Sequence, residues 1–126
     1  MASRISELVL KCADPELLAQ FWCGVLGYVE IDREDVGLIE IGPPEAGFGG
    51  LQPTIILMPG TDARTDRLAL HIDVNPVDRD QDAELERLLA LGARRLDLGQ
   101  PDDASWYVLA DPEGNEFCLL RRRLEP

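Results

Sequence analysis

Basic residues, histidine and cysteine are all scarce in this chain. It carries 12 Lys and Arg against 24 Asp and Glu, which gives a formal net charge of −12, and it has one histidine and three cysteines. A field of this sign repels nucleic acid and anionic membranes, because both need a positive surface on their protein partner. The one basic cluster, Arg121 to Arg123, is typical of a solvated tail or edge. We therefore expect neither of these partners.

Long hydrophobic runs and a secretion signal are also missing. No apolar run approaches the roughly 18 residues of a membrane-spanning helix, and the N-terminus lacks the layout of a signal peptide. Cys12, Cys23 and Cys118 form no CxxC pair, and their odd number favours reduced thiols. We therefore expect a cytoplasmic protein. Its 126 residues, 45% hydrophobic and 29% charged, suit a single globular domain.

Several catalytic motifs are absent too. The chain has no GxSxG, no GxGxxG and no Walker-type loop. The segment from Gly42 to Gly50 is rich in glycine and proline, which predicts an irregular loop, but it lacks the lysine and the following helix of a phosphate-binding loop. Two interpretations of this loop stay open: a structural hairpin loop, or a mobile flap in which Phe48 contacts a ligand.

What the chain does have is an internal duplication. From Glu7 a strand-like alternation is followed by a helical pattern that ends at Gly27. The same alternation begins again at His71, which is 64 positions after Glu7 (71 − 7 = 64), and a second helical pattern ends at Gly92. Two such units can enclose a cleft that neither forms alone. The duplication also places Glu7 and His71, two candidate metal ligands, at equivalent positions.

The first copy predicts one helix and four strands. Asp14 suits the helix N-cap, Pro15 suits its first position because proline has no N–H to leave unpaired, and Gly27 suits its end. An apolar stripe at helical spacing consists of Leu17, Leu18, Phe21, Trp22, Val25 and Leu26. The predicted strands span residues 5–12, 28–31, 36–41 and 55–58.

The second copy repeats this order. Asp78 or Asp80 is the expected N-cap, and Asp111 to Asn115 has strong turn chemistry. The apolar stripe of its helix consists of Leu85, Leu88, Leu89 and Leu91. The predicted strands span residues 68–74, 94–98, 105–110 and 117–120. The chain thus predicts an α+β fold of two tandem β-α-β-β-β modules, about residues 4–60 and 66–123, in one domain of residues 1–126.

Strand alternation predicts which side chains share a face. One face of each first strand suits packing under a helix, and the other carries Glu7, Val9 and Lys11 in the first copy and His71 and Asp73 in the second. If the sheets are open, these groups face solvent. If the sheets curl, the same groups line a cleft. The remaining lining residues would then be Ile55, Leu57, Val108 and Trp106.

Several motifs together resemble one known group. They are Glu7-Leu-Val-Leu-Lys-Cys-Ala-Asp14, Phe21-Trp22, Leu26-Gly27 and Asp111-Pro-Glu-Gly-Asn115. The chain is similar, over nearly its whole length, to the vicinal oxygen chelate superfamily of glyoxalases, extradiol dioxygenases, epimerases and bleomycin or fosfomycin resistance proteins. The resemblance implies two modules whose mixed sheets curl around a central cleft, and a homodimer. It says little about the reaction, because one fold hosts many functions.

The resemblance also implies four metal-ligand positions, on the first and fourth strands of each module. Carried over, these are Glu7, Leu57, His71 and Cys118. Leu57 cannot bind a metal, and Cys118 stands where a glutamate is usual. Three ligands with an open position would still suit zinc, which thiolate favours over iron or manganese. We therefore expect no usual metal centre, with a divalent zinc or nickel ion as the alternative.

Each candidate also has a structural interpretation. His71 would be a hydrogen-bonded structural group, Glu7 an exposed strand carboxylate, and Cys118 a small buried hydrophobe. Lys11 would pair with Glu7 or Asp73 in an ion-pair network without a catalytic role.

Two functional hypotheses follow. In the first, the protein binds a small, largely apolar or aromatic molecule, as bleomycin-resistance-like proteins do. The expected contacts are Val9, Lys11, Phe48, Leu57, Asp73, Trp106, Val108 and Cys118, with Glu7 and His71. In the second, it is a glyoxalase-type lyase or isomerase in which Glu7 and His71 act as metal ligands or as an acid–base pair.

Overall fold

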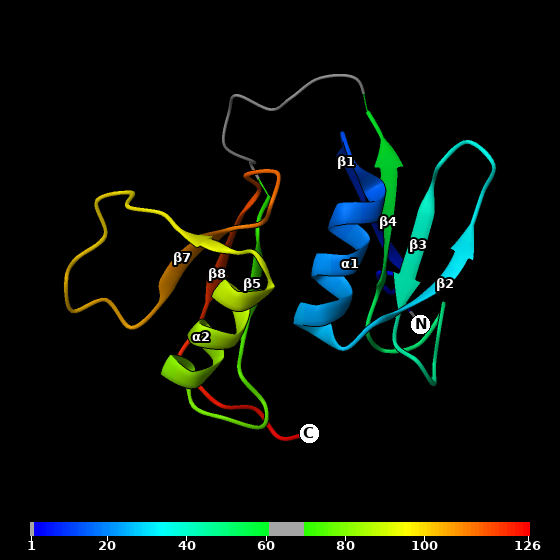
Figure 1. The fold of residues 1–126 in the computed structure, drawn as a ribbon. Coiled ribbons are helices and arrows are strands. Elements are labelled where there is room, and N and C mark those ends of the chain that lie inside the picture. The colour runs from blue at the N-terminus through cyan, green and yellow to red at the C-terminus, as the bar shows by residue number, and fades with distance from the viewer. Residues whose placement is uncertain (1, 61–69) are drawn as a thin grey trace. The chain divides into compact units, whose positions relative to one another are not determined.

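The computed structural model describes residues 2–60 and 70–126. The chain forms two compact units, Met1–Ala63 and Arg64–Pro126 (Figure 1). Within the described residues, each unit contains one helix and one four-stranded mixed sheet, in the order β-α-β-β-β. The predicted α+β fold of two modules is therefore confirmed. Each unit is described by itself below.

The first unit contains β1 (Glu7–Cys12), α1 (Pro15–Leu26), β2 (Val29–Arg33), β3 (Ile39–Gly42) and β4 (Thr54–Pro59). Its strand order is β1-β4-β3-β2, with β1 parallel to β4 and the other pairs antiparallel. The helix signals are confirmed: Asp14 accepts a hydrogen bond from the backbone N–H of Leu17, and Gly27 ends α1 with φ 70°.

The core of the first unit lies between α1 and the strands β3 and β4. The buried side chains of α1 are Leu18, Ala19, Phe21, Trp22 and Val25. Phe21 and Trp22 meet edge to face with their ring centroids 5.2 Å apart. The sheet contributes Ile39, Ile41, Ile55 and Leu57, and burying each such side chain is worth about 1.5–3 kcal/mol. Leu17, by contrast, is 42% exposed, so the predicted stripe was one residue too wide.

The second unit contains β5 (Ile72–Val74), α2 (Gln81–Leu91), β6 (Arg94–Arg95), β7 (Tyr107–Ala110) and β8 (Glu116–Leu119). Its strand order is β5-β8-β7-β6, with β5 parallel to β8. Asp80 rather than Asp78 caps α2, since its side chain accepts a hydrogen bond from Ala83. Leu85 and Leu88 are buried as predicted, whereas Leu91, which the predicted stripe included, is 37% exposed.

The predicted turn between β7 and β8 is closed by a buried carboxylate. Oδ1 of Asp111 accepts hydrogen bonds from the backbone N–H groups of Glu113 and Asn115, each at 2.9 Å. The amide of Asn115 donates to both oxygens of Asp111, and Gly114 takes φ 87°. This network determines where β8 begins, and hence the position of Glu116.

Several strands are shorter than predicted. Residues 36–38 belong to a turn in which the N–H of Gly37 bonds to Glu34, so β3 begins only at Ile39. After Arg95, the N–H of Leu96 still donates to the carbonyl of Val108, and the side chain of Gln100 bonds to Leu98 and Leu96 in the loop that follows. Part of the strand predicted over residues 68–74 lies outside the described residues. Among the described residues, neither helix has the length and hydrophobicity needed to cross a membrane.

Candidate functional site

The second sheet has two chemically different faces. The hydroxyl of Tyr107 donates to Asp82 of α2 at 2.6 Å, so Tyr107 and its register partner Leu119 face the helix. Side chains one position away face the other side. There, Cys118 pairs in register with Asp73 of β5 and with Val108 of β7. These residues, together with those two positions away along each strand, form the face on which the candidate site lies.

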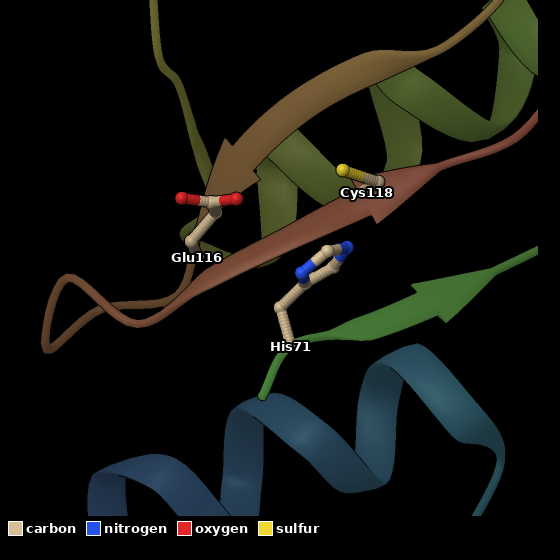
Figure 2. A group of neighbouring side chains, drawn as sticks. All are labelled: His71, Glu116 and Cys118. Carbon is tan, nitrogen blue, oxygen red and sulfur yellow. The ribbon is translucent and has the colours of Figure 1, made fainter. Parts of the chain in front are cut away.

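Three potential donor side chains meet on this face. His71, just before β5, and Glu116 and Cys118, both on β8, place one donor atom each within 4.8 Å of one another. Figure 2 shows the three side chains projecting into the same space. Cys118 is 6% exposed and Glu116 is half-buried, whereas His71 is exposed. The site is therefore closed on the side of β8 and open on the side of β5.

The carboxylate of Asp73 lies next to the imidazole of His71. Its Oδ1 lies 3.2 Å from Nε2 of His71, and both side chains are more than two-fifths exposed. A carboxylate on one ring nitrogen fixes the orientation of the ring and leaves the other nitrogen, here Nδ1, as the donor or acceptor. This is the arrangement that supports a metal-bound or substrate-bound histidine.

The three donors fit a zinc ion better than a hard ion. An imidazole nitrogen, a thiolate and a carboxylate are all zinc ligands, and three of them leave a fourth position for water or substrate. In a tetrahedral site, donors about 2.0–2.3 Å from zinc lie roughly 3.3–3.8 Å from each other. The three donor atoms lie at most 4.8 Å from one another, so they would have to move about 1 Å closer together to bind zinc in this geometry. The thiolate disfavours manganese and magnesium.

Glu116 was not predicted as a site residue. The predicted strand began at Phe117, which left Glu116 in the turn, although β8 begins at Glu116. The available signal was its spacing of two from Cys118, which places both side chains on one face of a strand. His71, Asp73 and Val108, by contrast, do lie on the face that the alternation predicted, and Cys118 lies there with them.

The structure corrects the placement of Leu57. It pairs in register with Leu10 and Ile39 and is fully buried, so it lies on the face toward α1 and not on the face of Glu7. Ile56, which pairs with Val9, occupies the other face. The prediction thus assigned the side chains of β4 to the wrong faces, since Ile55, which pairs with Leu8 and Ile41, also lies toward α1. Ile56 cannot bind a metal either.

The remaining first-unit candidates are exposed. Glu7, Val9 and Lys11 alternate with half-buried neighbours along β1, and neither charged group pairs with another described residue. Phe48 is 59% exposed in the loop between β3 and β4. Because Glu7 and His71 belong to different units, their joint site stays a prediction, as does ligand contact by Phe48.

Trp106 lies beside a cavity of the second unit. The residue precedes β7, is 37% exposed, and lines a cavity of about 360 Å³ formed largely by residues 95–107. Tyr107, its neighbour, has a raised pKa, because its hydroxyl donates to Asp82 and because of partial burial and the charge of Asp82.

Fold and site together define a two-module protein of the vicinal oxygen chelate type. Residues 7–120 match the family model described as a glyoxalase-like domain. The chain therefore belongs to the glyoxalase-like domain family of that superfamily. It has no match among curated proteins.

Solved structures of similar fold include two fosfomycin resistance proteins. FosX from Mesorhizobium loti is 19% identical, with a TM-score of 0.73 and coverage of 98% of this chain and 95% of that one. FosX from Listeria monocytogenes, complexed with Mn(II) and sulfate, is 21% identical, with a TM-score of 0.72 and coverage of 98% and 94%. A glyoxalase/bleomycin resistance protein/dioxygenase family enzyme from Burkholderia phytofirmans is 19% identical, with a TM-score of 0.68 and coverage of 93% and 97%.

Proposed function

We propose that this protein binds a small, largely apolar or aromatic molecule on the face of its second sheet that lies away from α2. The observation that carries this proposal is the meeting of His71, Glu116 and Cys118 on that face, with Asp73 holding the histidine. Binding sites for small molecules combine a few convergent polar groups with apolar walls. Val108, the register partner of Cys118, supplies such a wall.

The burial pattern supports this assignment. The outer face of an open antiparallel sheet usually carries solvated polar side chains. Here Val108 is 5% exposed, Cys118 6% and Ala110 fully buried, although all three lie on the face away from α2. Apolar and polar groups thus occur together where simple solvent alternation would place only polar ones.

A second candidate function is a metal-assisted lyase or isomerase. The observation that favours it is the donor set itself, since His71, Glu116 and Cys118 together fit zinc. A bound divalent ion would supply Lewis acidity toward vicinal oxygens of a substrate. The three side chains would hold the ion, and Asp73 would keep the imidazole oriented. A relative of similar fold, FosX from Listeria monocytogenes, has been solved in complex with Mn(II), which supports this candidate.

Metal analysis and ligand titration separate the two candidates. Protein purified without chelator is analysed for zinc and nickel, together with the variants His71→Ala and Glu116→Gln. Glu86→Gln, an exposed carboxylate of α2, is the matched control. About one equivalent of metal that is lost in the two site variants and kept in the control supports the enzyme.

The binding function has its own readout. Saturable quenching of tryptophan emission by members of an aromatic compound library, in metal-free protein and weakened in His71→Ala, supports the binder. If no compound binds in the metal-free or the zinc-loaded form, the binding function is wrong.

A further inference from the structure

The cavity beside Trp106 belongs to a long loop of the second unit. Residues 96–106 connect β6 to β7, and the wide loop that leads into β7 is visible in Figure 1. The cavity of about 360 Å³ lies between this loop and the sheet edge, and all its walls come from the second unit. Its volume falls in the range of sites that take small molecules, about 300–1,000 Å³.

The loop is braced by its own hydrogen bonds. The amide of Gln100 accepts from the N–H of Leu98 at 2.8 Å and donates to the carbonyl of Leu96 at 3.1 Å. At its far end, the buried amide of Gln81 donates to the carbonyl of Ser105 at 2.9 Å. A cavity whose wall is held in this way needs little ordering when a ligand enters, which favours binding.

Negative charge predominates in the cavity wall. Asp97 and Asp102 supply two carboxylates against one guanidinium, that of Arg95. One oxygen of Asp97 accepts from the N–H of Gly99, whereas Asp102 has no hydrogen bond or ion pair with any described residue. Arg95 already lies over the ring of Tyr107, at 4.9 Å from its centroid. The carboxylate of Asp102 is therefore available to a ligand.

Trp106 adds an aromatic surface to these carboxylates. The residue is 37% exposed and lines the cavity. Indole attracts cations more strongly than the other aromatic side chains do, and it also stacks on planar rings. The net charge of −12 draws cations toward the whole chain.

We infer that this cavity is a binding site for a small organic cation that carries an aromatic ring, with Trp106 contacting the ring or the cation and Asp102 neutralising its charge. The site is separate from the His71, Glu116 and Cys118 cluster and goes beyond the function proposed above. Its ligand class is set by the aromatic and acidic wall and not by metal donors.

Benzyltrimethylammonium is the probe for the test. Tryptophan emission is followed as the probe is added to the intact chain, and saturable quenching in the millimolar range or below is expected. Trp22 is 2% exposed and lies in the first unit, so quenching reports Trp106. Trp106→Phe should abolish the quenching. Calorimetry should show that the affinity for the probe falls less in Trp106→Phe than in Trp106→Ala.

Charge variants test the role of Asp102. Asp102→Asn should weaken binding about two- to fivefold, as expected for one partly exposed ion pair. Asp103→Asn removes the same charge one residue away, outside the cavity wall, and should leave binding unchanged. His71→Ala should also leave probe binding unchanged. If this variant loses metal but still binds the probe, the result concerns the function proposed above and leaves the present inference intact.

Results with the control ligands and with the cationic probe itself can overturn the inference. They are equal or tighter binding of 3-phenylpropionate, equal binding of benzyl alcohol, and no saturable change with the cationic probe up to its solubility limit. Loss of probe binding in His71→Ala would likewise overturn it, because the site would then belong to the donor cluster.

Discussion

Oδ1 of Asp73 lies 3.2 Å from Nε2 of His71, and Asp73 is also the register partner of Cys118. One residue of β5 thus contacts the imidazole of the donor cluster while its strand pairs with the strand that supplies the thiol. An outer carboxylate of this kind orients a ligating histidine and restricts its rotation. In the proposed metal site we therefore expect Asp73 to position His71.

Replacing Asp73 by Asn should weaken zinc binding by about 10- to 100-fold, the range for loss of a carboxylate behind a ligating histidine. Competition with a chromogenic zinc chelator measures the affinity. Thermal unfolding should change little, because both side chains are well exposed. Equal zinc affinity in Asp73→Asn and in the control Glu86→Gln would show that the carboxylate does not position the imidazole.

Replacing Asp111 by Ala should destabilise the second unit by about 2–4 kcal/mol. The buried carboxylate accepts from two backbone N–H groups and from the amide of Asn115, and its loss leaves these donors unpaired away from water. Urea unfolding measures the free energy. Asp103→Ala, an exposed loop position, is the control and should stay within about 0.5 kcal/mol of the wild type.

Local signals in the sequence were sufficient for much of the fold. Asp14 at the N-cap, Gly27 after α1 and the turn from Asp111 to Asn115 each act through hydrogen bonds or φ angles within a few residues. Such features depend little on the rest of the chain. Alternation placed His71 and Asp73 correctly away from α2, because polar and apolar residues alternate strictly around them.

The errors occurred where the pattern was ambiguous or the partner distant. Ile55 to Met58 is an unbroken apolar run, so periodicity could not tell which side chains face α1, and Leu57 was placed on the wrong face. Glu116 was missed because the end of a strand is set by its turn. The cavity beside Trp106 depends on long-range bonds such as Gln81 to Ser105, which no local pattern reveals.

The register of β4 can be tested by truncating its side chains. Leu57→Ala should cost about 2–5 kcal/mol of stability, since the side chain is fully buried among Leu10, Ile39 and α1. Ile56→Ala, on the half-buried opposite face, should cost clearly less. Chemical denaturation measures both. A larger loss for Ile56→Ala would mean that the faces are reversed and that the original prediction for Leu57 was right.

Both tyrosines should ionise at higher pH than an ordinary phenol. The pKa of Tyr107 is raised mainly because its hydroxyl donates to Asp82, and that of Tyr28 is raised by burial. A pKa that is higher in the folded than in the unfolded state stabilises the fold below the ordinary value near 10, and this contribution disappears as the pH rises through the folded value. Stability should therefore fall on the alkaline side of pH 10.

Ultraviolet titration of the phenolate band tests this assignment residue by residue. Tyr107→Phe leaves the band of Tyr28 alone, and Asp82→Asn should return the pKa of Tyr107 toward its ordinary value, because the carboxylate that accepts its hydrogen bond is gone. Tyr28 should be unaffected by Asp82→Asn, since its hydroxyl donates to the carbonyl of Pro53 in the first unit. An unchanged Tyr107 titration in Asp82→Asn would mean that the bond between α2 and β7 does not form in solution, and the orientation of Tyr107 toward α2 would then have to be reconsidered.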